Sequence, residues 1–250
     1  MAKERHLPRA PIIEAVVDFR VRTPINLNVN VFRDMAVLKE LGYSKHEALT
    51  ELEFGFHRQP GKPPESTQID RGIIGYRYTS ADGKFVAQIR RNGATISRLE
   101  PYTEWTALFA HATAIYTAYA GVAEIEEVSR IAVRYINRMP LPVDRVGDFS
   151  PFLTSPPKFP DAIPVTLSHF LTKLQVQDTE SGIQATVIQT IHQAVKLADK
   201  VVVVLDIDAF HQGPIPIDPE TTLQKFAALR NFKNRVFFAS ITEEAAKLFE

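Results

Sequence analysis

The chain contains no cysteine among its 250 residues. Without thiols it can form no disulfide, use no thiolate nucleophile and build no cysteine-based zinc or iron–sulfur site. It also lacks net charge, because 29 lysines and arginines balance 29 aspartates and glutamates. This balance excludes an overall field that would recruit nucleic acid or an anionic membrane, although it leaves room for a local basic patch.

Long apolar runs are missing as well. The longest, VVVVL at 201–205, is far shorter than the roughly 20 apolar residues of a membrane helix. The opening segment, MAKERHLPRAP, is charged and lacks the apolar stretch of a signal peptide. The sequence has no zinc-binding histidine spacing, glycine-rich phosphate loop or nucleophile elbow. We therefore expect a cytoplasmic protein that does not associate with membranes.

Hydrophobic periodicity predicts a strand, a helix, four antiparallel strands and a second helix in residues 1–122. Helical spacing covers 28–43 and again 104–121, where His111 lies off the apolar stripe and is expected to be solvated. Asn92-Gly93 separates two alternating segments and is a dipeptide that type I′ hairpin turns favour. The register predicted from this turn pairs Ile89 with Ile96, Gln88 with Ser97 and Arg90 with Thr95.

Residues 123–250 repeat this plan loosely, with a strand at 130–142, a proline-rich segment, three strands and a final helical region. The sequence therefore predicts an α+β protein of two strand–helix–antiparallel-meander–helix halves, 1–122 and 123–250. We expect the halves to be co-folded as one unit, with the helices on one face of the sheet. The topology resembles the TATA-binding-protein fold, whose duplicated halves make a saddle, but a fold does not carry function with it.

The opposite sheet face is then free, and polar residues at alternating positions point to it. In the first half these are Glu14, Asp18, Arg20, Glu53, His57, Gln88 and Arg90. In the second half they are Arg134, Arg138, Lys173, Gln175, Gln184, Thr186, Asp206 and Asp208. Mixed charge argues against tracking a polyanion and favours a protein–protein surface.

Asp206 and Asp208 are the first candidates for chemistry. Two residues apart on a strand, they point to the same face, with Cα atoms roughly 7 Å apart. Such carboxylates can hold Mg²⁺ for phosphoryl transfer, provided that a third acid such as Asp18 or Glu14 lies close. The alternative is structural pairing with basic residues of neighbouring strands.

Arg134 and Asn137 stand out on the strand at 130–142. Arg134, like Lys173, can pair with the aspartates, or it can act as an anion clamp. Asn137 points to the core side, where a buried amide must find partners; a bond to a neighbouring loop is expected, and contact with a ligand is the alternative. His211 is predicted to lie in a loop and not to bind metal.

Four segments, PRAPIIEAVVDFRV, PYTEW, RIAVRYINRMPLP and LDIDAF, together resemble a sporadically distributed bacterial family of uncharacterised proteins of about this length. The matching motif positions are Glu14, Arg134, Asn137, Asp206 and Asp208, which makes these the candidate binding residues. The resemblance implies no activity, cofactor or catalytic residue. The patchy distribution of the family is typical of accessory genes, including defence and toxin–antitoxin loci.

Three hypotheses for function follow. The first is a non-enzymatic interaction or regulatory protein without a cofactor, which binds a protein partner through the mixed-charge sheet face or the proline-rich loops at 59–64 and 151–164. The second is a Mg²⁺-dependent phosphoesterase or nucleotide-processing enzyme, with metal on Asp206 and Asp208 and phosphate on Arg134. The third is a nucleic-acid-binding protein that uses a saddle-like sheet, which the mixed charge disfavours.

Overall fold

The computed structural model describes residues 1–57, 65–143, 147–158, 160, 162–163, 167–192 and 200–250. These residues form a mixed α+β fold with one continuous nine-stranded antiparallel sheet, four α-helices and one 3-10 helix. The strands are β1 (Ile12–Arg22), β2 (Tyr43–His57), β3 (Glu65–Ser80), β4 (Phe85–Arg90), β5 (Gly93–Leu99), β6 (Glu127–Leu141), β7 (Leu171–Gln177), β8 (Gln184–Ile191) and β9 (Val201–Ile215). The helical elements are η1 (Val29–Phe32), α1 (Ala36–Glu40), α2 (Trp105–Val122), α3 (Pro219–Ser240) and α4 (Glu243–Lys247). None of these helices is both long and apolar enough to cross a membrane.

The strand order is β2-β3-β4-β5-β1-β6-β9-β8-β7. β1 and β6, which are the first strands of the two predicted halves, therefore pair with each other at the centre of the sheet. Outward from β1 the order is β5, β4, β3 and β2, and outward from β6 it is β9, β8 and β7. Polar residues of β1, β6 and β9 are thus brought together from distant parts of the sequence.

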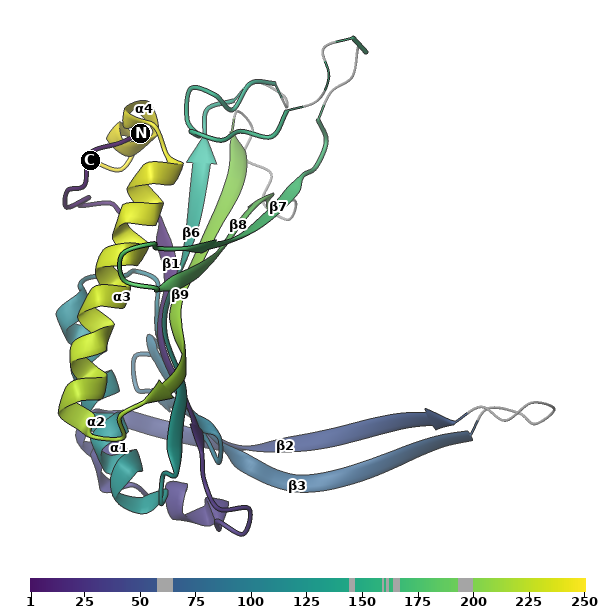
Figure 1. The fold of residues 1–250 in the computed structure, drawn as a ribbon, viewed down its shortest axis with the longest axis vertical. Helices are drawn as coiled ribbons and strands as arrows, with labels where there is room; N and C mark the ends of the chain where they lie inside the picture. Colours follow the sequence, from purple (N-terminus) through teal and green to yellow (C-terminus); the bar gives the residue numbers. More distant parts are fainter. Residues whose placement is uncertain (58–64, 144–146, 159, 161, 164–166, 193–199) are drawn as a thin grey trace.

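The helices lie on one face of the sheet, and the opposite face is bare of helices (Figure 1). We call this the open face. The β2–β3 hairpin extends away from the helices as a long arm, and the sheet around β7 and β8 curves toward the same side (Figure 1). The core therefore lies between the sheet and the helices, while the open face presents the alternate side chains of the strands.

Aromatic and apolar side chains of α2 hold β1 at the centre of the sheet. Leu108, Tyr116 and Tyr119 are buried, as the helical spacing of the apolar stripe predicts, and Ile115 is buried beside them. The ring of Phe19 on β1 meets Tyr116 at 4.8 Å and Tyr119 at 5.3 Å between ring centroids, in edge-to-face arrangements. This geometry is favourable for aromatic pairs, and it directs the neighbouring residues of β1 to the open face.

The β4–β5 hairpin has a register two residues away from the predicted one. Arg90 pairs with Gly93 instead of Thr95, and the other two predicted pairs are displaced in the same way. A Cβ added to Gly93, whose φ is 129°, would meet the carbonyl oxygen of Phe19 at 2.0 Å. The glycine is therefore required by the close approach of β1 and β5. The faces of the strands remain as predicted, because a shift of two residues preserves the alternation.

The first predicted helix is broken into η1 and α1 at Met35, whose backbone is extended. Asn28 caps η1, since its side chain accepts a hydrogen bond from the backbone N–H of Asn30. Such local side-chain bonds compete with a continuous α-helix. Phe32 and Leu38 are buried, so both apolar positions still face the core.

Two histidine predictions are wrong. His111 is half-buried, because its ring stacks on Phe85 with centroids 3.9 Å apart and Nδ1 lies 3.3 Å from the hydroxyl of Tyr43. Burial lowers the pKa of His111 as a result. His211 lies within β9, opposite Ile131, because pairing with β6 continues beyond the predicted end of the strand.

Candidate functional site

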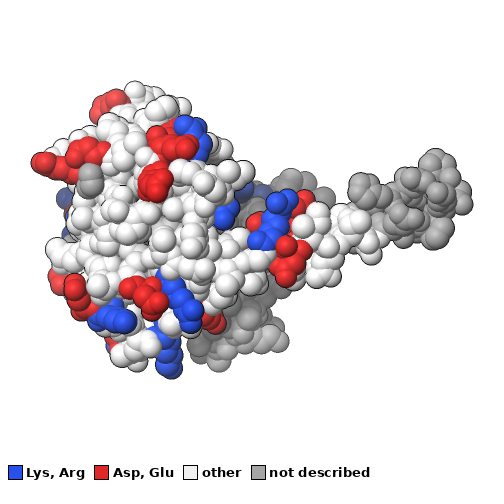
Figure 2. Space-filling view, turned by 90° about the horizontal axis from the view of Figure 1, so that it is seen from below, with Lys and Arg blue, Asp and Glu red and all other residues white. Residues whose placement is uncertain are grey.

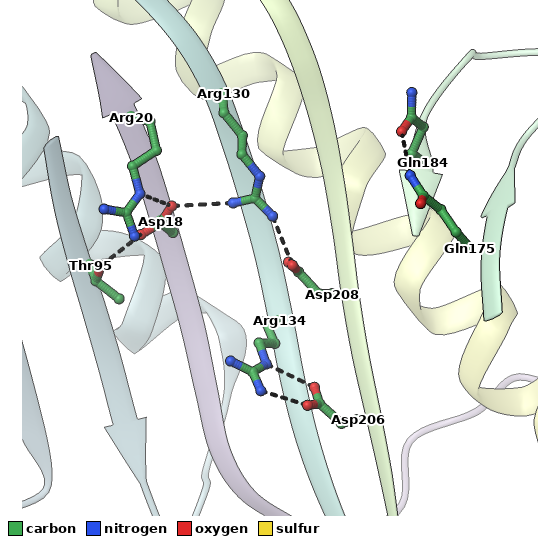
Figure 3. Close-up of polar contacts among 9 residues, drawn as sticks. All are labelled: Asp18, Arg20, Thr95, Arg130, Arg134, Gln175, Gln184, Asp206 and Asp208. Atoms are coloured by element: carbon green, nitrogen blue, oxygen red, sulfur yellow. Dashed lines mark hydrogen bonds and ion pairs between the residues drawn. The ribbon is translucent and has the colours of Figure 1, made fainter. Parts of the chain in front are cut away.

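Charged side chains on the open face form a continuous chain of ion pairs across β1, β6 and β9 (Figure 3). Arg130 places one guanidinium nitrogen 3.3 Å from Asp18 on β1 and the other 2.7 Å from Asp208 on β9. Asp18 also accepts hydrogen bonds from Arg20 Nε at 3.0 Å and from the hydroxyl of Thr95 at 2.6 Å. These groups meet because alternate residues of neighbouring antiparallel strands share a face.

Arg134 and Asp206 form a second ion pair between β6 and β9. The guanidinium donates two hydrogen bonds to the carboxylate, at 2.8 Å from Nε and 2.6 Å from Nη2. This bonding raises the pKa of Arg134, against the opposite effect of burial. Two parallel bonds make this a strong and directional form of ion pair. Of the two basic partners considered for the aspartates, Arg134 and Lys173, Arg134 is the one that binds Asp206.

Asp208 is a carboxylate whose surroundings oppose its charge. Burial raises its pKa, and the carboxylates of Asp18 and Asp206 act in the same direction. The positive charges of Arg130 and Arg134 lower the pKa and so offset part of this effect. The ionised form of Asp208 therefore depends on the arginines of β6.

Glu14 and Asn137 lie on opposite faces of the sheet. Glu14 is on the open face of β1, and its negative charge contributes to raising the pKa of Arg134. Asn137 is buried on the core face of β6, where Nδ2 donates a hydrogen bond to the carbonyl oxygen of Leu205 at 2.9 Å. The prediction that this amide bonds to a loop is wrong, because Leu205 of β9 is its cross-strand partner. Four of the five candidates thus share the open face, and Asn137 does not.

Within the described ranges, no group of three or more histidine, aspartate or glutamate side chains could hold a metal ion. Asp206 and Asp208 do point to the same face, but each is hydrogen-bonded to an arginine. Asp18, considered as a third ligand, is joined to Asp208 through Arg130. A Mg²⁺ ion at this position would have to displace guanidinium groups from the carboxylates.

Acidic and basic groups alternate beyond the centre of the open face. Arg77 of β3 pairs with Glu47 of β2 at 2.8 Å, and Arg138 of β6 pairs with Glu100 at 2.8 Å. Figure 2 shows basic and acidic side chains next to each other at the base of the arm and on the body. Fields of opposite sign cancel over short distances, so these pairs weaken the electrostatic field around the surface.

Apolar side chains are exposed on the β2–β3 arm and on the edge strand β7. Leu52, Phe54 and Ile69 of the arm are between 48% and 62% exposed, and Leu171 and Leu174 of β7 are 66% and 51% exposed. A two-stranded ribbon is only marginally stable by itself. An exposed apolar strand at the edge of a sheet is a ready site for contact with another chain.

The two proline-rich segments considered as binding loops have different outcomes. The first, 59–64, lies outside the described residues. In the second, 151–164, the described part packs onto the body, because Phe152 and Leu153 are buried and Leu153 forms a β-bridge with Ile241. This part of the segment therefore contributes to the core.

Sequence reasoning missed two residues that the structure brings forward. Arg130 joins two aspartates, and its spacing of four residues from Arg134 on a strand was a signal that both share a face. Lys233 is buried in α3, seven residues after the buried Phe226 and four after the buried Leu229. A lysine within an apolar helical stripe was the available signal for this second residue.

Comparison of the chain with protein-family models gives no match, and comparison with curated proteins gives none either.

Proposed function

We propose that the protein is a non-enzymatic interaction protein that binds a protein partner on its open face. The observation that carries this proposal is the arrangement in Figure 1, where the helices occupy one face and the β2–β3 arm projects on the other side. The bare face offers the side chains of nine strands, and the edge strands β2 and β7 offer backbone groups. Both kinds of contact are used when one protein chain recognises another.

The charge pattern favours a protein over a nucleic acid. Arg130 and Arg134 are the groups that a phosphate backbone would use, and both are bound by aspartates of β1 and β9. A nucleic acid would have to compete with these partly buried carboxylates for the same guanidinium groups. A protein surface carries both signs of charge and can match the alternation, which gives specificity.

The arm supplies apolar area for such a complex. Phe54 and Leu52 are two residues apart on β2, so their side chains share one face of the ribbon. Burying large apolar side chains of this kind against a partner is a principal source of binding free energy. The polar pairs of the open face would then position the partner, and the arm would hold it.

Two finer features belong to the same proposal. The mirrored strand order on the two sides of β1 and β6 supports an origin of the sheet by duplication of one strand–helix–meander–helix half. The resemblance of the RYIN and LDIDAF segments to a sporadically distributed bacterial family supports a role in an accessory locus. A protein encoded beside this chain is therefore the first partner to test.

The proposal is tested by site-specific photo-cross-linking in the native host. A photoreactive amino acid is placed at Phe54 on the arm, at Thr186 on the open face and at Ala228 on α3 as the control. We expect the first two positions to cross-link the same protein and Ala228 not to cross-link it. Phe54→Asp should weaken the complex and Ala228→Asp should leave it unchanged. Cross-linking from Ala228 alone, or no protein cross-linked from the open face, would contradict the proposal.

Nucleic-acid binding is the second candidate, because the sheet curves around its open face as a saddle does (Figure 1). It requires an affinity that falls steeply as salt concentration rises, since phosphate contacts release counterions. Affinity for mixed-sequence DNA and RNA at 50 and 200 mM salt distinguishes this candidate from the first. A Mg²⁺-dependent activity requires in turn that Asp206→Asn with Asp208→Asn abolish metal binding without unfolding the protein.

A further inference from the structure

A pocket of about 710 Å³ lies on the helix side of β6, away from the open face. It is bounded by α3, by the segment that leads into α2 and by the N-terminal residues. This volume is within the range of about 300–1,000 Å³ that is usual for small-molecule sites. Its aromatic lining consists of Tyr102, Trp105, Tyr135, Phe237 and Phe238. Asn137, one of the five candidate residues, also lines it.

Lys233 is the unusual residue of this pocket. The residue is only 7% exposed, and its ammonium lies 3.7 Å from the centroid of the Tyr135 ring. The hydroxyl of Tyr135 is held at 2.8 Å from that of Tyr102, so the ring has a defined position. Among the described residues, Lys233 makes no ion pair with a carboxylate. A buried ammonium without a counter-ion is costly, which indicates a site that receives an anion.

The surrounding charges strengthen this interpretation. Burial lowers the pKa of Lys233 to about 7, and the positive charge of Arg230, one helical turn earlier, acts in the same direction. Glu4 acts in the opposite direction, but it is exposed and therefore screened by water. Arg230 lies over the ring of Trp105 at 5.6 Å. The other charged or titratable groups that line the pocket are Arg5, His6, Tyr102, Glu104 and Tyr135.

Arg5 does not contribute free positive charge, because it pairs with Glu243 at 2.8 Å and with Glu250 at 2.6 Å. Lys233 and Arg230 are thus the two cations of the pocket that face an aromatic lining. An ammonium provides a point charge, and a guanidinium provides a planar pair of donors that matches the two oxygens of a carboxylate. The aromatic lining matches a planar apolar body.

We propose that this pocket binds a small aromatic monocarboxylate, with the carboxylate between Lys233 and Arg230 and the ring against Tyr102 and Trp105. A single negative charge compensates the buried ammonium without adding a second charge that the pocket does not balance. The ligand site and the proposed protein-binding face are on opposite sides of the sheet. A negative result for one proposal therefore does not contradict the other.

Trp105 makes the proposal directly measurable, because it is the single tryptophan of the chain and it lines the pocket. The full chain is titrated with benzoate, trans-cinnamate and indole-3-carboxylate, and binding is followed by Trp105 emission for the first two and by calorimetry for all three. We expect saturable binding of at least one carboxylate, and binding of its uncharged amide that is at least tenfold weaker. Binding at pH 8 should also take up protons, because the carboxylate raises the pKa of Lys233. Proton uptake is read from calorimetry in two buffers with different heats of ionisation.

The decisive variants are Lys233→Met and Arg230→Met, each of which should weaken binding at least tenfold. Lys225→Met is the matched control, since Lys225 lies on the same helix but does not line the pocket; it should bind as the unchanged protein does. Circular dichroism establishes that each variant is folded. Failure of all three carboxylates to bind, equal binding of the amide, or unchanged binding by folded Lys233→Met would overturn the proposal.

Discussion

Charged side chains on the two faces of β6 differ in whether a group of opposite charge lies beside them. On the open face, Arg130 and Arg134 are both held by carboxylates of neighbouring strands. On the core face, Tyr135 packs against the ammonium of Lys233, which has no carboxylate partner among the described residues. Paired charges on a sheet surface are explained by the stability and specificity of the fold. An unpaired buried charge destabilises the fold and therefore calls for a functional explanation.

The largest loss of stability is expected for Arg130→Met. The substitution leaves Asp18 and Asp208 without their shared partner in a partly buried site. We expect the free energy of unfolding to fall by about 3 kcal/mol, because uncompensated buried charge is strongly unfavourable. Urea denaturation at pH 7 measures this loss. An unchanged midpoint would mean that the network is not a stabilising element.

The second prediction is an increase in the free energy of unfolding. Lys233→Met removes an unpaired charge and keeps apolar volume, so we expect the free energy of unfolding at pH 6 to rise by roughly 2 kcal/mol. A variant that is more stable but binds no carboxylate would show that the lysine serves function at the expense of stability. A less stable variant would indicate that Lys233 has a structural role.

The pH dependence of stability provides a further test of Lys233. Lys233 holds its proton less tightly in the folded protein, where its pKa is about 7, than in the unfolded chain, where it is near 10.5. The unfolded state therefore binds more protons above pH 7, and this group makes the free energy of unfolding rise with pH from about 7 to 10.5. Urea denaturation between pH 6 and 9 should show that the difference between Lys233→Met and the unchanged protein shrinks as pH rises. A constant difference would contradict the lowered pKa.

Asp206→Asn tests the second ion pair of the open face. The amide loses the negative charge that receives two hydrogen bonds from Arg134. Because Arg134 is nearly half exposed, water compensates part of the loss, and we expect a decrease of about 1 kcal/mol. Thermal or urea denaturation measures this decrease. A decrease as large as that of Arg130→Met would show that side-chain exposure does not predict how much each ion pair contributes to stability.

The smallest effect is expected for Arg138→Met, which serves as the surface reference. Arg138 pairs with Glu100, whose side chain is 56% exposed. Exposed pairs contribute little, so the change in the free energy of unfolding should be below about 0.5 kcal/mol. The same denaturation series measures it, and a large loss here would remove the distinction between exposed and partly buried pairs.

Much of the fold could be predicted because the signals were local. Alternation located strands such as β6, whose burial pattern follows a period of two residues from Arg134 to Leu141. Helical spacing located α2, whose stripe of Leu108, Tyr116 and Tyr119 is buried. The register at Gly93 could not be predicted, because the contact that demands glycine there comes from Phe19, far away in the sequence.

The candidate site was predicted in part. The sequence placed Asp206, Asp208 and Arg134 on one face, because residues two apart on a strand point the same way. Which arginine pairs with which aspartate depended on the alignment of β6 with β9 and β1, and Arg130 was overlooked for that reason.

The amino-acid composition was sufficient to exclude thiol chemistry and to establish the charge balance. The order of residues along each strand was sufficient to predict the alternation and the mixed polarity of one sheet face, because side-chain direction in a strand is a local property. The tertiary structure alone decided which charges are paired and which are not. Ion pairing and burial depend on neighbours brought together by strand order and helix packing. Lys233 shows this most clearly, since its lowered pKa arises from burial in a pocket formed by three separate parts of the chain and from the positive charge of Arg230.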